Sequence, residues 1–248
     1  MKFLFILKYL PFLQKMLRHI LNVKGASLER EFYGTKYRNP VGICAGIDRE
    51  GQFFNELATF GPSFVEIGPA KKVDTILRNL RSCTHRKVQI LANLTGRQSV
   101  DEDLNLIEID RACSLLYDFA DVLTITVPRN GFENIIDRVL TIRQYNDDFK
   151  PVAVRLTNIL EEEDIEPIVR YSLQNGVDAI EVADIFFDKV RSIAGGIVPI
   201  VVISALKFPG DAAAFLEKGA SFISYVPQKS LPGLLRIRKI LKTLAVKQ

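Results

Sequence analysis

Short apolar runs alternate along the chain with stretches whose apolar residues recur at helical spacing. Eight runs of five to seven residues are nearly continuous in apolar side chains, which indicates strands buried on both faces. The runs are Pro40–Ala45, Phe64–Gly68, Val88–Leu94, Val122–Val127, Val152–Leu156, Ala179–Ala183, Pro199–Ser204 and Phe222–Val226. Strands that alternate with helices in this way are typical of βαβ units and a parallel sheet.

Eight such strands can close into a barrel without an exposed edge, and 248 residues suit eight repeats of about thirty residues. We therefore predict an α/β fold, a (β/α)8 TIM barrel, with an open doubly wound sheet as the alternative. The helices predicted around it are Ser99–Tyr117, Phe132–Tyr145, Glu161–Gln174, Pro209–Lys218 and Ser230–Leu244. Glycines predict three helix ends, at Gly176, at Gly219 and at the pair Gly195-Gly196, for which a phosphate contact is the alternative.

The first 24 residues differ from the rest of the chain. The apolar segment Phe3–Leu7 is followed by Lys8 and Pro11, and a second amphipathic turn runs to Leu21. The apolar segment is too short to span a bilayer, and no small-residue cleavage site marks a signal peptide. We predict residues 1–27 as an N-terminal amphipathic helical extension and residues 28–248 as the barrel. The extension consists either of two short helices in a membrane interface or of two helices packed against the barrel.

Charge separates the ends of the chain from its body. Residues 1–24 and 229–248 hold eleven of the 33 basic residues and no acidic one, which leaves 22 basic and 29 acidic residues between them. This distribution argues against a nucleic-acid groove over the body, and it favours an anionic membrane surface contacted by residues 1–24.

Cysteine and histidine content excludes several kinds of site. The three cysteines are far apart, so they predict neither a disulfide framework nor a CxxC site, and a reducing, cytoplasmic compartment fits best. The two histidines, His19 and His85, form no metal-binding pattern. We therefore expect no metal.

Two segments near the N-terminus carry the most specific motif. Residues 32–51 read FYGTKYRNPVGICAGIDREG, and residues 60–68 read FGPSFVEIG. They resemble the dihydroorotate dehydrogenase family, in which a short hairpin leads to NPVGLAAGFDKNG at the first strand and GFGFVEIG forms the second. Weaker similarity extends over nearly all of residues 28–240, and the basic, amphipathic N-terminus resembles the membrane-associated, quinone-dependent class. The resemblance implies a barrel that binds FMN and a small-molecule ligand at its mouth and oxidises dihydroorotate to orotate in pyrimidine biosynthesis.

The resemblance also implies site residues. The family's cofactor-binding positions correspond to Ala45, Gly46, Arg49, Gly68, Asn93, Arg155, Ser204 and Ala205, and its substrate-binding positions to Thr124, Arg129 and again Arg49. Arg49 and Arg155 stand where the family has lysine, so the charge is kept and its shape is changed. Apart from the family, the small residues Gly42, Ala45 and Gly46 would let a flat ligand approach the backbone, although small residues also suit a closely packed barrel mouth.

Other positions depart from the family pattern. The family's NVSSPN stretch, whose second serine is the catalytic base, corresponds to residues 124–129, which read TITVPR. Val127 therefore stands at the base position, where an isopropyl group can neither accept nor relay a proton. Its neighbour Thr126 is expected to point away from the site, because successive strand residues face opposite sides. At the flavin phosphate site, Ser204 and Ala205 replace glycines, and Pro227 removes a backbone donor.

Three hypotheses follow from the sequence. The leading one is a shortened, degenerate dihydroorotate dehydrogenase-like barrel that no longer oxidises dihydroorotate, with FMN either absent or held for another purpose. The first alternative is an active FMN-dependent dihydroorotate dehydrogenase, or a related flavin oxidoreductase, with rearranged residues. The second is a non-enzymatic scaffold that binds a membrane surface or a partner, peripheral on the inner face of the membrane.

Overall fold

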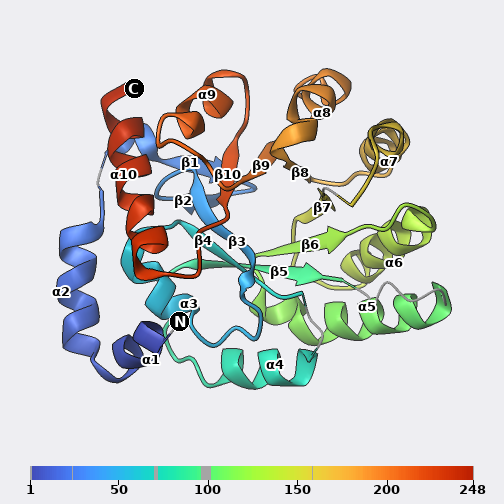
Figure 1. The fold of residues 1–248 in the computed structure, drawn as a ribbon. Helices are drawn as coiled ribbons and strands as arrows, with labels where there is room; N and C mark the ends of the chain where they lie inside the picture. The colour runs from blue at the N-terminus through green and yellow to red at the C-terminus, as the bar shows by residue number, and fades with distance from the viewer. Residues whose placement is uncertain (1, 24, 70–71, 96–101, 158, 248) are drawn as a thin grey trace.

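The computed structural model describes residues 2–23, 25–69, 72–95, 102–157 and 159–247. Eight parallel strands form one closed barrel in the order β10-β3-β4-β5-β6-β7-β8-β9 (Figure 1). The strands are β3 (Val41–Asp48), β4 (Phe64–Ile67), β5 (Gln89–Leu94), β6 (Val122–Thr126), β7 (Val152–Leu156), β8 (Ala179–Ala183), β9 (Ile200–Ser204) and β10 (Phe222–Tyr225). The predicted TIM barrel is thus confirmed and the open sheet is wrong, because β10 pairs with β3 and leaves no edge.

Helices surround the barrel (Figure 1). They are α3 (Phe54–Leu57), α4 (Val73–Arg81), α5 (Glu102–Leu116), α6 (Phe132–Gln144), α7 (Glu162–Gln174), α8 (Phe187–Ala194), α9 (Asp211–Glu217) and α10 (Leu231–Lys247). The three predicted helix ends are confirmed, since Gly176, Gly195 and Gly219 follow α7, α8 and α9 with positive φ. The predicted start of α5 at Ser99 lies outside the described residues.

Helices α4 and α8 lie outside the five predicted helix ranges, although the end of α8 was predicted at Gly195-Gly196. Helix α4 lies in the segment between the second and third barrel strands, and α8 lies between β8 and β9. Both helices are strongly amphipathic, with buried aliphatic residues such as Ile76 in α4 and Val190 in α8.

The barrel packs two apolar layers. Side chains that point outward from the strands join those of the helices in the main core, as Ile43, Val154 and Ile180 do. Side chains that point inward at the amino ends of the strands form a smaller cluster with an antiparallel hairpin, β1 (Arg30–Phe32) and β2 (Thr35–Tyr37). Phe32 and Tyr37 of the hairpin contact the ring of Phe222 and so close this end of the barrel.

The N-terminal extension forms two helices, α1 (Lys2–Tyr9) and α2 (Pro11–Leu21), which lie beside α3 and α10 (Figure 1). One side of the pair packs on the barrel, where Leu4, Leu7 and Leu21 are buried and Gln14 donates to Glu56 at 3.2 Å. For that side of the pair, the prediction of two helices packed against the barrel therefore holds. The boundary between residues 1–27 and 28–248 stays a prediction. Among the described residues, no helix is long and apolar enough to cross a membrane.

Candidate functional site

Four side chains at the centre of the barrel form a buried charged network. Arg155 of β7 donates through Nη1 to Glu66 of β4 and, at 3.3 Å, to Glu181 of β8. Its Nη2 donates to Cys44 Sγ of β3 at 2.9 Å. Inward residues of neighbouring parallel strands lie at one level, and Arg155 and Glu181 are direct partners in the register. None of the four residues is more than 7% exposed.

Glu66 links this network to the mouth of the barrel. Its Oε2 accepts a hydrogen bond from the backbone N–H of Ala45 at 2.8 Å, and its Oε1 accepts one from Asn93 Nδ2 at 2.8 Å. The Asn93 amide also contacts Thr126 Oγ1 at 3.0 Å and accepts from Thr95 Oγ1 at 2.5 Å. The amide of Asn93 is thus hydrogen-bonded by protein groups on both its nitrogen and its oxygen.

The network holds one guanidinium against two carboxyl groups. Burial favours the neutral form of Glu181 and raises its pKa to about 8, against the pull of Arg155. Burial disfavours the charged form of Arg155 too, but Glu181 and Glu66 outweigh it and hold the pKa of Arg155 well above its ordinary value. Burial also raises the pKa of the Cys44 thiol to about 12, so Cys44 is a neutral thiol and a poor nucleophile.

Below the network lies a small apolar chamber. A cavity of about 30 Å³ is enclosed by inward aromatic and aliphatic residues, with Thr124 and Glu181 at its polar end. Thr124 Oγ1 is buried there without a hydrogen-bond partner among the described residues, whereas Glu181 has the Ser224 hydroxyl beside it. The chamber has room for water, which needs about 10–15 Å³, and not for an organic substrate.

The orientation of β6 corrects one prediction. Thr126 points into the barrel mouth, where it contacts Asn93, whereas Val127 is buried in the core between strands and helices. Thr124, Thr126 and the inward partner Asn93 lie on one side because strand residues alternate with period two. The expectation that Thr126 points away is therefore wrong. Val127 is the residue that points away, and Thr126 is the hydroxyl nearest to the position expected for a base.

The predicted substrate-binding residues are not brought together. Thr124 is fully buried in the barrel interior. Arg129 is exposed, and its guanidinium pairs with Asp164 at 2.8 Å and Glu163 at 3.0 Å at the start of α7. The carboxylates hold the pKa of Arg129 above its ordinary value. Arg49 is exposed in the loop after β3, and no described contact joins it to Thr124 or Arg129.

The glycines of β3 and of the loop after β4 are needed for different structural reasons. A Cβ on Gly42 would lie 2.2 Å from the ring of Phe64, so this glycine makes room for a core aromatic and not for a ligand. For Gly42 the prediction of a ligand approach is therefore wrong, and the alternative of close packing within the barrel holds. Gly46 has a φ of +91° and open space where a Cβ would lie, which leaves its backbone accessible to a flat molecule. Gly68 also has positive φ, and its carbonyl accepts from the Gly46 N–H at 2.9 Å.

Acidic side chains lie at the predicted phosphate end. Ser204 Oγ donates to Asp184 at 2.7 Å and accepts from the N–H of Leu206 at 3.1 Å. The backbone N–H of Val226 donates to the backbone carbonyl of Ser204 at 2.9 Å. The adjoining pocket of about 370 Å³ is lined by Asp184 and Asp211 as well as by lysines.

These observations decide whether the residues fit FMN. A flavin phosphate needs converging N–H donors. Here the Leu206 N–H donates to the Ser204 hydroxyl and the Val226 N–H to the Ser204 carbonyl, while the Asp184 carboxylate lies beside Ser204. At the ring end, Asn93 and Arg155 already bond protein groups, although the space above Gly46 is open. The phosphate end does not fit the cofactor, so we derive no catalytic step through it.

Sequence reasoning missed several residues that the structure places in or near the site. Cys44, Glu66 and Glu181 belong to the central network, and a polar residue inside an otherwise apolar strand run was the available signal. Asp48 is a further example, since its carboxylate accepts the N–H groups of Gln52 and Phe53 and shapes the loop after β3. Burial raises the pKa of Asp48 to about 6 despite these hydrogen bonds.

Curated relatives share sequence with this chain. No family model matches it. It is 42% identical over 59 residues to the dihydroorotate dehydrogenase (quinone) of Christiangramia forsetii, which covers 24% of this chain and 17% of that protein. It is 23% identical over 195 residues to the enzyme of the same name from Cellvibrio japonicus, which covers 60% of this chain and 57% of that protein. It is 21% identical over 265 residues to the enzyme from Chromobacterium violaceum, which covers 77% of each protein. The chain spans less than two thirds of the first two relatives.

Solved structures share the fold. A dihydroorotate dehydrogenase from Eimeria tenella in complex with ferulenol superposes with a TM-score of 0.76 at 14% identity, over 94% of this chain and 90% of that one. A mandelate oxidase variant with an FMN adduct superposes with a TM-score of 0.57 at 15% identity, over 91% and 76% of the two chains. At these identities the likeness shows the fold alone. Sequence and fold together make this chain a divergent, shortened relative of the quinone-dependent dihydroorotate dehydrogenases.

Proposed function

We propose that this dihydroorotate dehydrogenase-like barrel has lost the oxidation of dihydroorotate. The observation that carries the proposal is the mouth itself, where Val127 points into the outer core and the nearest hydroxyl, Thr126, is hydrogen-bonded to Asn93. The charged groups nearby are used within the protein, since Arg155 binds Glu66 and Arg129 binds the acids of α7. The lack of fit for an FMN phosphate at Ser204 supports the same conclusion.

The first experiment measures bound flavin and turnover. The purified protein, given FMN, dihydroorotate and a quinone, should release no stoichiometric flavin on denaturation and should show no dye reduction. A positioned base contributes about 10² to 10⁴ in rate, so its loss leaves turnover far below the low end of typical enzymes, about 1 s⁻¹. Turnover at or above that value would establish the alternative, an active flavin oxidoreductase with rearranged residues, and loss of that turnover in Thr126→Val would then assign the base.

The variant Val127→Ser tests the position that aligns with the family's catalytic serine. Because Val127 faces the apolar core, a serine there should give no gain in turnover and should lower the free energy of unfolding by about 1–3 kcal/mol through an unpaired hydroxyl. Urea unfolding measures the second effect. A gain in rate would show that this residue reaches the mouth and would contradict the orientation of β6.

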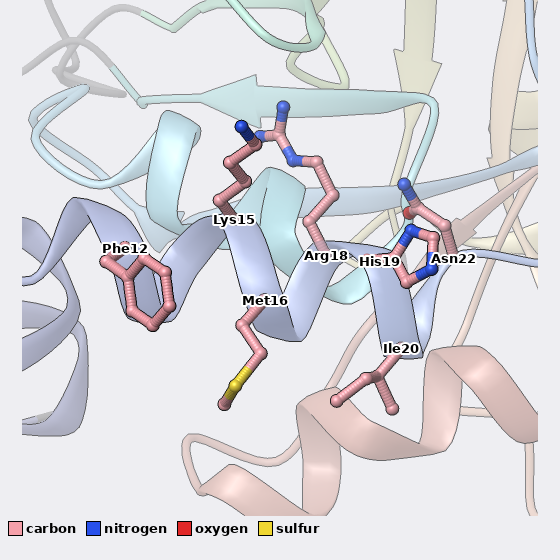
Figure 2. A pocket seen from close by; sticks show the side chains of 7 residues that line it. All are labelled: Phe12, Lys15, Met16, Arg18, His19, Ile20 and Asn22. Carbon is pink, nitrogen blue, oxygen red and sulfur yellow. The ribbon is translucent and has the colours of Figure 1, made fainter.

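A second candidate function is attachment to an anionic membrane surface, supported by the free side of α1 and α2. Seven large apolar residues there are exposed by 44% to 81%: Phe5, Ile6, Tyr9, Leu10, Phe12, Met16 and Ile20. Figure 2 shows Met16 and Ile20 projecting from one side of α2, along an open groove, while Lys15 and Arg18 project from the other. An amphipathic helix with basic flanks is suited to an interface, and each basic residue near an anionic surface contributes about 1 kcal/mol.

Vesicle flotation tests this candidate. Phe12→Gln/Met16→Gln/Ile20→Gln should abolish retention by anionic vesicles at low ionic strength, and salt should weaken retention of the wild type. The control, Ile107→Gln/Ile185→Gln/Ile197→Gln, removes three apolar side chains elsewhere that are exposed by 62% to 72%, and it should float like the wild type. Equal retention of both variants, or none of the wild type, would contradict the attachment.

A further inference from the structure

A basic pocket lies at the amino ends of β3, β4 and β5, on the side of the barrel opposite to the mouth. Its volume is about 550 Å³. Five cationic side chains line it, together with Ser63, Val88 and Gln89, and none of these lining residues is acidic. The five are Arg18, Lys36, Arg38, Arg86 and Lys87.

These cations come from separate parts of the chain that the fold brings together. Arg18 belongs to α2, Lys36 to the hairpin, Arg38 to the segment before β3, and Arg86 and Lys87 to the segment before β5. The positions of two of them are fixed by the backbone, since Arg38 Nη2 donates to the Lys87 carbonyl at 3.0 Å and Arg86 Nη1 to the Phe119 carbonyl at 2.7 Å. The pocket is therefore a built feature of the fold and not a flexible tail.

Only part of this positive charge is neutralised by the protein. Arg86 pairs with Asp121 at 3.3 Å, and Lys87 Nζ donates to the neutral amide of Gln14 at 3.2 Å. Arg18 Nη2 is buried without a hydrogen-bond partner among the described residues. Burial, and then the nearby positive charge of Arg38, lower the pKa of Arg18, as expected for a partly buried cation with another cation nearby.

We propose that this pocket binds a phosphate monoester, either a free metabolite or a lipid headgroup. A dianionic phosphate offers three acceptor oxygens, which suit several converging guanidinium and ammonium donors better than a single carboxylate does. A recess lined by charges of one sign also raises the local concentration of the opposite ion. The volume leaves room for a group beyond the phosphate, such as glycerol.

The pocket adjoins the proposed membrane-facing groove but does not depend on it. Arg18 lines both the basic pocket and the groove on α2. It projects to the side of α2 opposite to Met16 and Ile20 (Figure 2). Because Arg18 borders both the pocket and the groove, a lipid phosphate would enter past Arg18 at the edge of the groove, and a free phosphate ester would enter from solvent.

The test measures glycerol 3-phosphate binding to the full-length protein by calorimetry at pH 7.5, where a phosphate monoester is mainly dianionic. Arg18→Gln/Lys36→Gln should weaken binding at least tenfold, and neither side chain makes a hydrogen bond in the described structure that its loss would break. The control, Arg138→Gln/Arg170→Gln on α6 and α7, removes the same charge from exposed side chains and should bind like the wild type.

Vesicles separate the two sources of the phosphate. Preference for phosphatidic acid over phosphatidylserine at equal surface charge, lost in Arg18→Gln/Lys36→Gln, assigns a lipid headgroup, whereas binding of glycerol 3-phosphate alone assigns a free metabolite. The variant Phe12→Gln/Met16→Gln/Ile20→Gln should keep its affinity for glycerol 3-phosphate, so a failed membrane attachment is distinguished from a failed phosphate site. Absence of binding in both assays, or equal loss in the basic-pocket and control variants, would overturn the proposal.

Discussion

At the scale of single residues, Arg155 determines what the barrel centre is able to do. Its planar guanidinium reaches Glu66, Glu181 and Cys44 at once, which the single ammonium group of a lysine could not do with the same geometry. The positive charge that a ligand at the mouth would require is thereby held inside the protein. The sequence identified Arg155 as a site residue, but its partners, which are 26 to 111 positions away along the chain, are visible only in the fold.

Glu181→Gln should change how stability depends on pH. The folded state keeps the proton on Glu181 up to about pH 8, while the unfolded chain releases it near 4.5, so the free energy of unfolding should fall as the pH rises between these values. The slope is at most about 1.4 kcal/mol for each pH unit. Asp48 acts in the same direction, but only up to about pH 6, so the window from pH 6 to 8 reports on Glu181.

Urea unfolding at pH 6, 7 and 8 measures this slope. The wild type should lose stability across the series, and Glu181→Gln, which has no proton to release, should lose less. Glu29→Gln, at an exposed position, is the control and should follow the wild type. An unchanged slope in Glu181→Gln would show that this carboxyl is already ionised at pH 6.

At the scale of elements, the hairpin and the first two barrel strands depend on one close contact. Gly42 of β3 lies against the ring of Phe64 of β4, which packs in turn on Tyr37 and Phe222. The sequence predicted the strands well because their apolar runs are continuous. It could not separate Gly42 from Gly46, because a glycine that accommodates a neighbouring ring and one that leaves open space look alike in a single chain.

Gly42→Ala should destabilise the protein by about 1–3 kcal/mol, because its Cβ would lie 2.2 Å from the Phe64 ring and force the core to shift. Gly210→Ala is the control, since no atom lies within 4 Å of the added Cβ and the φ of −70° suits alanine. Urea unfolding compares the two. In the background Phe64→Leu the cost of Gly42→Ala should shrink, and an unchanged cost there would show that the ring is not its cause.

At the scale of the whole molecule, the two ends of the barrel differ in character. The mouth end has acids beside its hydroxyls, as Asp184 does beside Ser204, whereas the amino end gathers cations next to α2. The sequence predicted eight strands and a basic N-terminal extension from local patterns. It could not predict the basic pocket, because Arg18, Lys36 and Arg86 come together only when the helices, the hairpin and the loop before β5 fold onto one another. Nor could it orient Thr126, because alignment to a family motif does not determine which side chains of a strand point into the barrel.

The charged centre of the barrel also constrains the order in which the chain can fold. Arg155 must close a loop of 89 residues to meet Glu66 and one of 111 residues to meet Cys44. Such distant contacts form late, because closing the loop costs conformational entropy before the contact itself contributes any stability. Until β3 and β4 meet β7, the arginine and both carboxyls are best kept in water. We therefore expect an early intermediate to leave this layer hydrated and open, so that the final dehydration of the Arg155 and Glu66 charges, and not strand formation, limits the closing of the barrel.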